Sequence, residues 1–205
     1  YYTNLDSFNE TADRLSVTAF SYYPGGKSAT VTYKLDGQEV YSSSEYPYAY
    51  TTPVLSQGHH RLVATSSCGN TTQTKTYGIY VGADGRISTA VSKMTDVKTN
   101  WSYNPISYCM HYDIFKGMSE TTFEPDTPVS RGMIVTLLYR MEGQPAAGTN
   151  NFPDVSGGRY YTKAVSWANS NGIVLGFDDG TFRPEEPVTR EQAATFFYRY
   201  AKYKG

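Results

Sequence analysis

The spacing of apolar residues changes near residue 86, and this change divides the chain into two parts. In the first part apolar and polar residues alternate, as they do from Leu15 to Ala19, and a period of two is typical of half-buried strands. Asp36-Gly37 separates two such stretches and predicts a tight hairpin turn. Short strands bounded by turn residues predict an antiparallel β-sandwich over residues 1–86. Further strands are expected at residues 29–33, 39–41, 48–54, 60–65 and 74–81.

The second part, residues 87–205, has the spacing of amphipathic helices. Helices are expected at residues 101–112, 131–141, 160–171 and 190–203. In the second of these, Ile134, Leu138 and Met141 recur at i, i+4 and i+7, which predicts one inward-facing stripe. Ala193, Phe197 and Tyr200 form the matching stripe in the last helix. The short apolar segments 114–115 and 173–174 are expected to be strand-like.

These helices belong to an internal repeat. Residues 108–141 align with residues 167–200 without a gap. Residues 87–147 and 148–205 are therefore predicted to be two copies of one unit, and each needs a neighbour to bury its apolar face. The identical pairs include Gly117/Gly176, Phe123/Phe182, Pro125/Pro184, Arg131/Arg190, Thr136/Thr195, Tyr139/Tyr198 and Arg140/Arg199.

The repeat carries a set of motifs in a fixed order. Phe152-Pro153-Asp154-Val155 is followed by a glycine turn at Gly176, a Phe182-x-Pro184 segment and Thr189-Arg190-Glu191-Gln192. The first copy has Ser130-Arg131-Gly132-Met133 at the last position. Over roughly residues 94–205 the pattern resembles the S-layer homology family, whose hallmark is Thr-Arg-Ala-Glu.

That resemblance implies a helical bundle in which three repeats commonly form a pseudo-threefold prong. With two repeats visible, the bundle here would be an incomplete trimer, and a third repeat is expected beyond Gly205. The resemblance also implies non-covalent anchoring to a secondary cell wall polymer, often through a pyruvylated sugar.

The hallmark residues suggest how such a ligand could be bound. Thr189 and Ser130 are placed to cap their helices, and each following arginine stands beside a helix N-terminus, which favours an anion. A guanidinium can grip a carboxylate with two hydrogen bonds. Gln192 can close a capping box, whereas Met133 cannot, and Gly132 costs about 1 kcal/mol of helix propensity. The expected glycan-binding residues are Arg131, Arg190, Asp96, Asp154, Ser130, Thr189, Trp167, Gly117 and Gly176.

Two kinds of residue in this set have a second interpretation. Asp96 and Asp154 could accept hydrogen bonds from sugar hydroxyls or could cap helices. Trp167 could be a sugar platform, although a place in the core explains it more simply.

The first 86 residues offer fewer signs of a site. The segment from Gly58 to Ala64, followed by Gly69-Asn70, resembles the last hairpin of bacterial immunoglobulin-like domains, which implies a fold and a spacer or adhesive role. His59 and His60 are adjacent, so on a strand they point to opposite faces and cannot chelate one metal. The tyrosines at positions 46, 48 and 50 either pack in the sandwich or form a stacking surface for a sugar.

Composition excludes several classes of function. The net charge is −1 without a basic stripe, so nucleic-acid binding is not expected. No apolar run approaches the roughly 18 residues of a membrane span. Cys68 and Cys109 are interpreted as separate thiols, with a bridge between them as the alternative. Asp178-Asp179-Gly180 lacks the spaced oxygens of a calcium loop and predicts a turn. No catalytic motif, metal cluster or cofactor site is recognised.

The leading hypothesis is a non-catalytic, extracellular segment that anchors a protein to the bacterial cell wall, with the sandwich as spacer or adhesive module. One alternative is a structural module of the surface layer that binds no glycan. Another is the accessory tail of a larger surface enzyme, because the chain begins within folded-type sequence and is interpreted as part of a longer protein.

Overall fold

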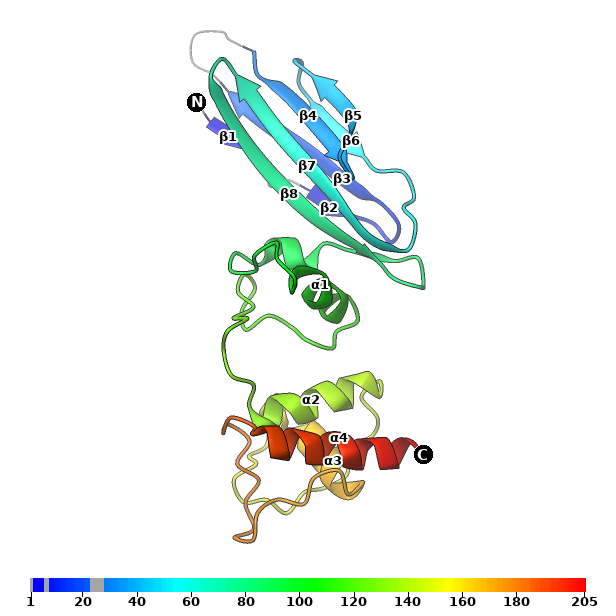
Figure 1. The fold of residues 1–205 in the computed structure, drawn as a ribbon, viewed down its shortest axis with the longest axis vertical. Helices are drawn as coiled ribbons and strands as arrows, with labels where there is room; N and C mark the ends of the chain where they lie inside the picture. Colours follow the sequence, from blue (N-terminus) through cyan, green and yellow to red (C-terminus); the bar gives the residue numbers. More distant parts are fainter. Residues whose placement is uncertain (1, 6–7, 23–27) are drawn as a thin grey trace. The chain divides into compact units, whose positions relative to one another are not determined.

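The computed structural model describes residues 2–5, 8–22 and 28–205, which fall into two compact units (Figure 1). Unit 1 contains Tyr1–Tyr112 and Lys116–Glu124, and unit 2 contains Asp113–Phe115 and Pro125–Gly205. The boundary between the units therefore lies inside the first sequence repeat.

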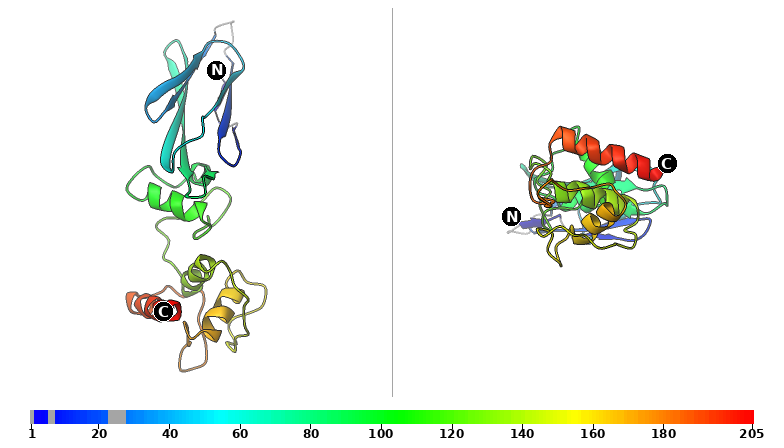
Figure 2. Two further views of the ribbon diagram at one scale, coloured as in Figure 1. Left: turned by 90° about the vertical axis from the view of Figure 1, so that its right-hand side faces the viewer. Right: turned by 90° about the horizontal axis from the view of Figure 1, so that it is seen from below.

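Unit 1 contains two antiparallel sheets, which face each other in the left view of Figure 2. In the first sheet β3 pairs with β1, β2 and β6; the second sheet has the order β5-β4-β7-β8-β9. The predicted β-sandwich is confirmed, although the pattern missed the short strands β1, β2 and β9. The strands are β1 Tyr2–Asn4, β2 Phe8–Glu10, β3 Leu15–Tyr22, β4 Thr30–Leu35, β5 Gln38–Ser43, β6 Tyr48–Thr51, β7 Gly58–Cys68, β8 Thr71–Val81 and β9 Ile87–Ser88.

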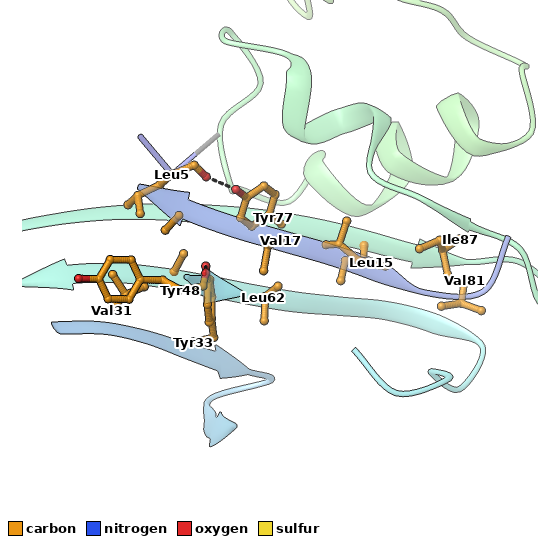
Figure 3. Close-up of a cluster of buried hydrophobic side chains, with 13 residues drawn as sticks. Leu5, Leu15, Val17, Val31, Tyr33, Tyr48, Leu62, Tyr77, Val81 and Ile87 are labelled. Atoms are coloured by element: carbon orange, nitrogen blue, oxygen red, sulfur yellow. Dashed lines mark hydrogen bonds between the residues drawn. The ribbon is translucent and has the colours of Figure 1, made fainter. Parts of the chain in front are cut away.

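The sandwich core forms because alternate residues of facing strands point inward (Figure 3). Leu15 and Val17 of β3 are buried together with Val31 of β4 and Leu62 of β7. The Tyr77 hydroxyl donates a hydrogen bond to the carbonyl of Leu5, which joins the two sheets. The predicted turn between β4 and β5 is confirmed as well, with positive φ at Asp36 and Gly37.

Two other expectations for the sandwich can be compared with the structure. Tyr48 is buried and Tyr50 stacks on Tyr33 at 5.9 Å between ring centroids, whereas Tyr46 precedes the strand and is exposed, so the three do not form one platform. The two histidines do face opposite ways. His60 pairs with Asp36 at 2.7 Å, and His59 packs on Tyr80.

The first half of the first repeat packs on the sandwich, through η1 (Ala90–Lys93) and α1 (Tyr103–His111). Tyr80 of β8 contacts the rings of Tyr108 and His111. The Ser92 hydroxyl bonds both the amide and the carbonyl of Gly78. Residues 87–112 therefore share unit 1 with the sandwich. Cys68 and Cys109 are free, half-buried thiols of this same unit, and burial raises the pKa of Cys109.

Unit 2 contains α2 (Arg131–Met141), α3 (Thr162–Ser170) and α4 (Arg190–Lys204), whose bounds agree closely with the sequence predictions (Figure 1). Trp167, Ile173 and Phe182 lie at the centre of its core. Ile173 and Val174 form no strand; instead their amides donate to the carbonyl of Ala168 at the end of α3.

The predicted apolar stripes are wrong in detail. On α2 the buried residues include Val135, Leu138 and Tyr139, while Met141 is exposed. On α4, Phe196 is the buried residue and Phe197 is exposed. The stripes are displaced because segments distant in sequence decide which side of each helix is covered. Among the described residues, no helix has both the length and the apolar character that crossing a membrane requires.

Candidate functional site

An aspartate near the start of each repeat positions a loop of the same repeat. The carboxylate of Asp154 accepts hydrogen bonds from the amides of Phe182 and Arg183 at 2.9 and 2.6 Å. In the first repeat, Asp96 binds the amides of Phe123 and Glu124 at 2.9 and 2.7 Å. These bonds lower the pKa of Asp96 below its usual value. Both carboxylates therefore hold the Phe-x-Pro loops, and neither caps a helix.

Contrary to the expectation, Arg131 does not project into solvent. It is buried, and its guanidinium carbon lies 4.5, 4.8 and 5.1 Å from the ring centroids of Phe177, Phe182 and Phe196. Its Nε donates to the carbonyl of Phe182 at 2.8 Å. Burial lowers its pKa, with Glu186 acting in the opposite direction, but an arginine remains charged. Residues of the second repeat thus enclose the guanidinium of Arg131, which belongs to the first repeat.

The N-terminus of α2 is occupied by the same loop. The amides of Arg131 and Gly132 donate to the carbonyls of Glu186 and Pro184 at 2.9 and 2.8 Å, and Ser130 caps the amide of Met133. Gly132 also lies against the ring of Tyr161, where an added Cβ would come within 3.0 Å of the ring. This helix end is therefore an attachment point for the second repeat and is closed to an anion, contrary to the expectation.

The N-terminus of α4 keeps the predicted capping box. Thr189 accepts from the amide of Gln192, whose side chain accepts from the amide of Thr189. Arg190 follows the cap and is exposed. The predicted turn at Asp178–Gly180 is confirmed, and Asp179 is bound by Thr181 and by Arg183 at 2.7 Å.

A groove of about 360 Å³ lies between this end of α4 and the loop after α3. Arg131 reaches it from the buried side, and Arg199 lies on α4. Phe177 in its wall lies between two guanidinium groups, with Arg183 at 4.1 Å and Arg131 at 4.5 Å from the ring centroid. The groove therefore combines cations, an aromatic surface and hydroxyl or amide groups. Its lining is Arg131, Leu175, Gly176, Phe177, Thr189, Glu191, Gln192, Thr195, Phe196 and Arg199.

Comparison with known proteins identifies the repeats. The family model of the S-layer homology domain matches residues 93–132 and 151–194. The chain contains two S-layer homology domains. Each match contains the aspartate, the Phe-x-Pro loop and the hallmark arginine described above.

Relatives share this part of the chain. An endoglucanase of Bacillus sp. (strain KSM-635) is 33% identical over 106 residues, which is 52% of this chain and 11% of the relative. The outer membrane protein SlpA of Thermus thermophilus is 48% identical over 52 residues, 25% of this chain and 6% of the relative. A cellulosome-anchoring protein of Acetivibrio thermocellus is 27% identical over 128 residues, 58% of this chain and 28% of the relative. The chain thus spans a small part of its curated relatives, and it is a protein of the bacterial cell surface.

A solved structure of fibronectin(III)-like modules of CbhA from Clostridium thermocellum also matches. It covers 40% of this chain and 97% of that chain, at 20% identity and a TM-score of 0.32.

The groove brings together three of the expected binding residues, namely Arg131, Gly176 and Thr189. Trp167 is buried in the core, which agrees with the simpler of its two interpretations. Ser130 is a buried helix cap. Gly117 belongs to unit 1, where carbonyls of Ser119 and Thr122 leave no room for a side chain. Asp96, Asp154 and Arg190 do not line the groove.

Sequence reasoning missed Phe177, Gln192, Thr195 and Arg199 as groove residues. A signal existed for two of them, because Thr195 and Arg199 are identical to Thr136 and Arg140 of the first S-layer homology domain. Arg140 donates to the carbonyl of Ile114 at 3.2 Å, whereas Arg199 lines the groove. The same residue pair therefore has different surroundings in the two domains.

Proposed function

We propose that the S-layer homology domains anchor this chain to the cell wall by binding a secondary cell wall polymer in the groove beside α4. The observation that carries the proposal is the convergence of Arg131 and Arg199 on one groove that also has an aromatic wall. The polymer would present a negatively charged sugar, such as one carrying a pyruvate ketal. The proposed role is binding without catalysis.

Arg131 is suited to bind an anion because its position is already determined. Its Nε is engaged by Phe182, and three rings restrict the guanidinium plane, so the terminal nitrogens need little ordering to meet a carboxylate. A buried cation gains more from a paired anion than an exposed one, since water screens the pair less. The arrangement favours a ligand carboxylate over a neutral hydroxyl.

The rest of the groove supplies the contacts that a sugar ring needs. The exposed side chain of Leu175 offers an apolar surface, while Thr189, Gln192 and Thr195 offer hydroxyl and amide groups to the sugar hydroxyls. Glu191 on the rim disfavours a ligand with negative charge spread over its whole surface. A sugar with one localised acidic group fits this pattern best.

Wall binding tests the proposal. Purified cell walls, native or stripped of their secondary polymer, would be mixed with the chain and with its Arg199→Gln variant. Loss of a charged hydrogen bond weakens binding by about 1.5–3 kcal/mol, so we expect roughly a tenfold or larger fall in affinity. Native walls should bind the wild type, and stripped walls should not.

Lys163→Gln is the matched control, because Lys163 is an exposed cation of α3 outside the groove. It should leave wall binding unchanged. Equal binding to native and stripped walls, or unchanged affinity of Arg199→Gln, would contradict the groove as the polymer site.

A second role follows from the relatives. Several of them are named as enzymes, such as the endoglucanase, yet this chain matches only 11% of that protein. We propose that a catalytic domain, where one accompanies these repeats, lies outside the matched segment. Sequencing the gene beyond both ends of the chain decides this point.

A further inference from the structure

Arg183 packs on the ring of Phe177 but does not line the groove. Its guanidinium carbon lies 4.1 Å from the ring centroid, and that of Arg131 lies 4.5 Å from the same centroid. Of these two cations, Arg131 reaches the groove. A guanidinium is attracted to an aromatic ring, so Arg183 stabilises the position of the ring on which Arg131 also packs.

Arg183 is itself held by the loop of residues 177–183. Its Nη2 donates to the carboxylate of Asp179 at 2.7 Å, and its Nε donates to the hydroxyl of Thr181 at 3.2 Å. The Thr181 hydroxyl in turn donates to Asp179 at 2.6 Å. These bonds, first from Thr181 and then from Arg183, hold the pKa of Asp179 well below its usual value. The carboxylate is therefore charged at neutral pH and holds the guanidinium in one place.

The backbone of Phe177 is fixed in the same loop. Its amide donates to the carbonyl of Thr181 at 2.8 Å, and its carbonyl accepts from the amide of Gly180 at 2.9 Å. With the backbone fixed, the position of the ring depends on its side-chain torsions. The guanidinium groups of Arg131 and Arg183, packed on the ring, restrict those torsions.

The first repeat builds the equivalent loop without these residues. Asp96 holds that loop by two amide bonds, as Asp154 holds the loop of the second repeat. The ring and the ion pair are therefore not required to form the loop, which points to a role in the groove. Three positions differ between the repeats, where Met118, Glu120 and Glu124 of the first stand in place of Phe177, Asp179 and Arg183.

We propose that Arg183 is a positioning residue for polymer binding, because it fixes the ring of Phe177 against the guanidinium of Arg131. Arg131 then meets the ligand carboxylate with little reorganisation, while Arg183 itself does not touch the ligand. This role rests on the proposed function of the groove. The ordering of Arg131, however, can be measured without any polymer.

Hydrogen exchange of the Arg131 Nε–H, followed by nuclear magnetic resonance, measures that ordering. The bond from this group to the carbonyl of Phe182 protects the proton. In Arg183→Gln the exchange should be at least about tenfold faster, because the ring that covers the guanidinium is released. Asp179→Asn keeps an acceptor for Thr181 but loses the ion pair, so it should have a smaller effect in the same direction.

Arg159→Gln is the matched control for Arg183→Gln. Arg159 is also an exposed arginine paired with a carboxylate, that of Glu185 at 2.9 Å, and it lies outside the groove. Its replacement should leave the exchange of the Arg131 proton unchanged. An exchange rate that is equal in Arg183→Gln and the wild type overturns the proposal, whatever the cell walls bind.

Wall binding tests the consequence for the ligand. Arg183→Gln should bind native walls at least about threefold more weakly than the wild type, and Arg159→Gln should bind like the wild type. In a Phe177→Leu chain, Arg183→Gln should cause no further loss, because the ring through which it acts is gone. Circular dichroism and urea midpoints show whether each variant is folded, so that a loss of binding is not a loss of structure.

The outcomes separate this role from the groove assignment. If Arg199→Gln weakens wall binding but Arg183→Gln does not, the positioning role is wrong and the groove remains the polymer site. A full additional loss from Arg183→Gln in the Phe177→Leu chain also overturns the role, since Arg183 would then act by another route. If the wild type binds native and stripped walls equally, the groove is not the polymer site and Arg183 has no ligand to prepare for.

Discussion

At the scale of single residues, Gly132 shows how a local rule can be reversed by distant contacts. Helix propensity alone makes this glycine a defect at the start of α2. In the structure a Cβ at this position would lie 3.0 Å from the carbonyl oxygen of Pro184 and 3.0 Å from the ring of Tyr161. Both neighbours come from the second repeat, so neither could be inferred from the sequence around position 132. The glycine allows the two repeats to touch.

Gly132→Ala should therefore destabilise unit 2 by about 1–3 kcal/mol, the usual cost of overpacking, despite the better propensity of alanine. Urea unfolding measures the change. Glu191→Ala is the control at the equivalent, exposed position of α4 and should remain within about 0.5 kcal/mol of the wild type. A gain near 1 kcal/mol in Gly132→Ala would show that propensity outweighs the contact.

At the scale of elements, helix bounds were predictable and loop contacts were not. The predicted range of α2 agrees with the structure and that of α4 differs by one residue, because caps and apolar spacing are local signals. The bonds from Asp154 to the loop at Phe182 join segments far apart in the chain. Both repeats contain the same pair, since Asp96 and Phe123 correspond to Asp154 and Phe182. The sequence pattern nevertheless gave no direct sign that the two residues of each pair are in contact.

Asp154→Asn should loosen the Phe182 loop and lower the stability of unit 2 by about 1–3 kcal/mol, because the amide has one acceptor oxygen where the carboxylate offers two. Urea unfolding followed by tryptophan fluorescence reports the loss through buried Trp167. Asp178→Asn, an exposed acid in the nearby turn, serves as control. Equal stability of the two variants would mean that the loop is held by its other contacts.

At the scale of the whole molecule, the unit of sequence and the unit of packing differ. The first repeat is continuous in sequence, but its first half packs on the sandwich and its second half on the other repeat. Periodicity identifies helices and repeats, whereas this division depends on which surfaces are complementary. The burial of Arg131 also depends on which surfaces are complementary. Because of it, the candidate site is the groove, and not the pair Arg131 and Arg190 that the sequence predicted to be exposed.

The attachment of α1 to the sandwich places His111 where pH should act on unit 1. Its side chain is 6% exposed, and among the described residues its Nδ1 has no hydrogen-bond partner. Burial lowers its pKa, Arg86 acts in the same direction, and Asp84 and Glu10 oppose it. Below about pH 6.5 the unfolded chain therefore binds a proton more readily than the folded chain does.

The stabilisation from neutral His111 should thus be complete above about pH 6.5 and decline as the pH falls towards the lowered pKa of the folded state. Urea midpoints measured between about pH 5 and 8 should fall on acidification in the wild type and fall less steeply in His111→Gln. His59, whose pKa burial also lowers, contributes with the same sign, so His59→Gln should flatten the slope too, but less because His59 is exposed. The pKa of Asp96 is lowered, so its contribution to the pH dependence of stability appears only at more acidic pH and does not overlap with that of the histidines. An unchanged slope in His111→Gln would show that protonation of this residue is not coupled to the packing of α1 on the sandwich.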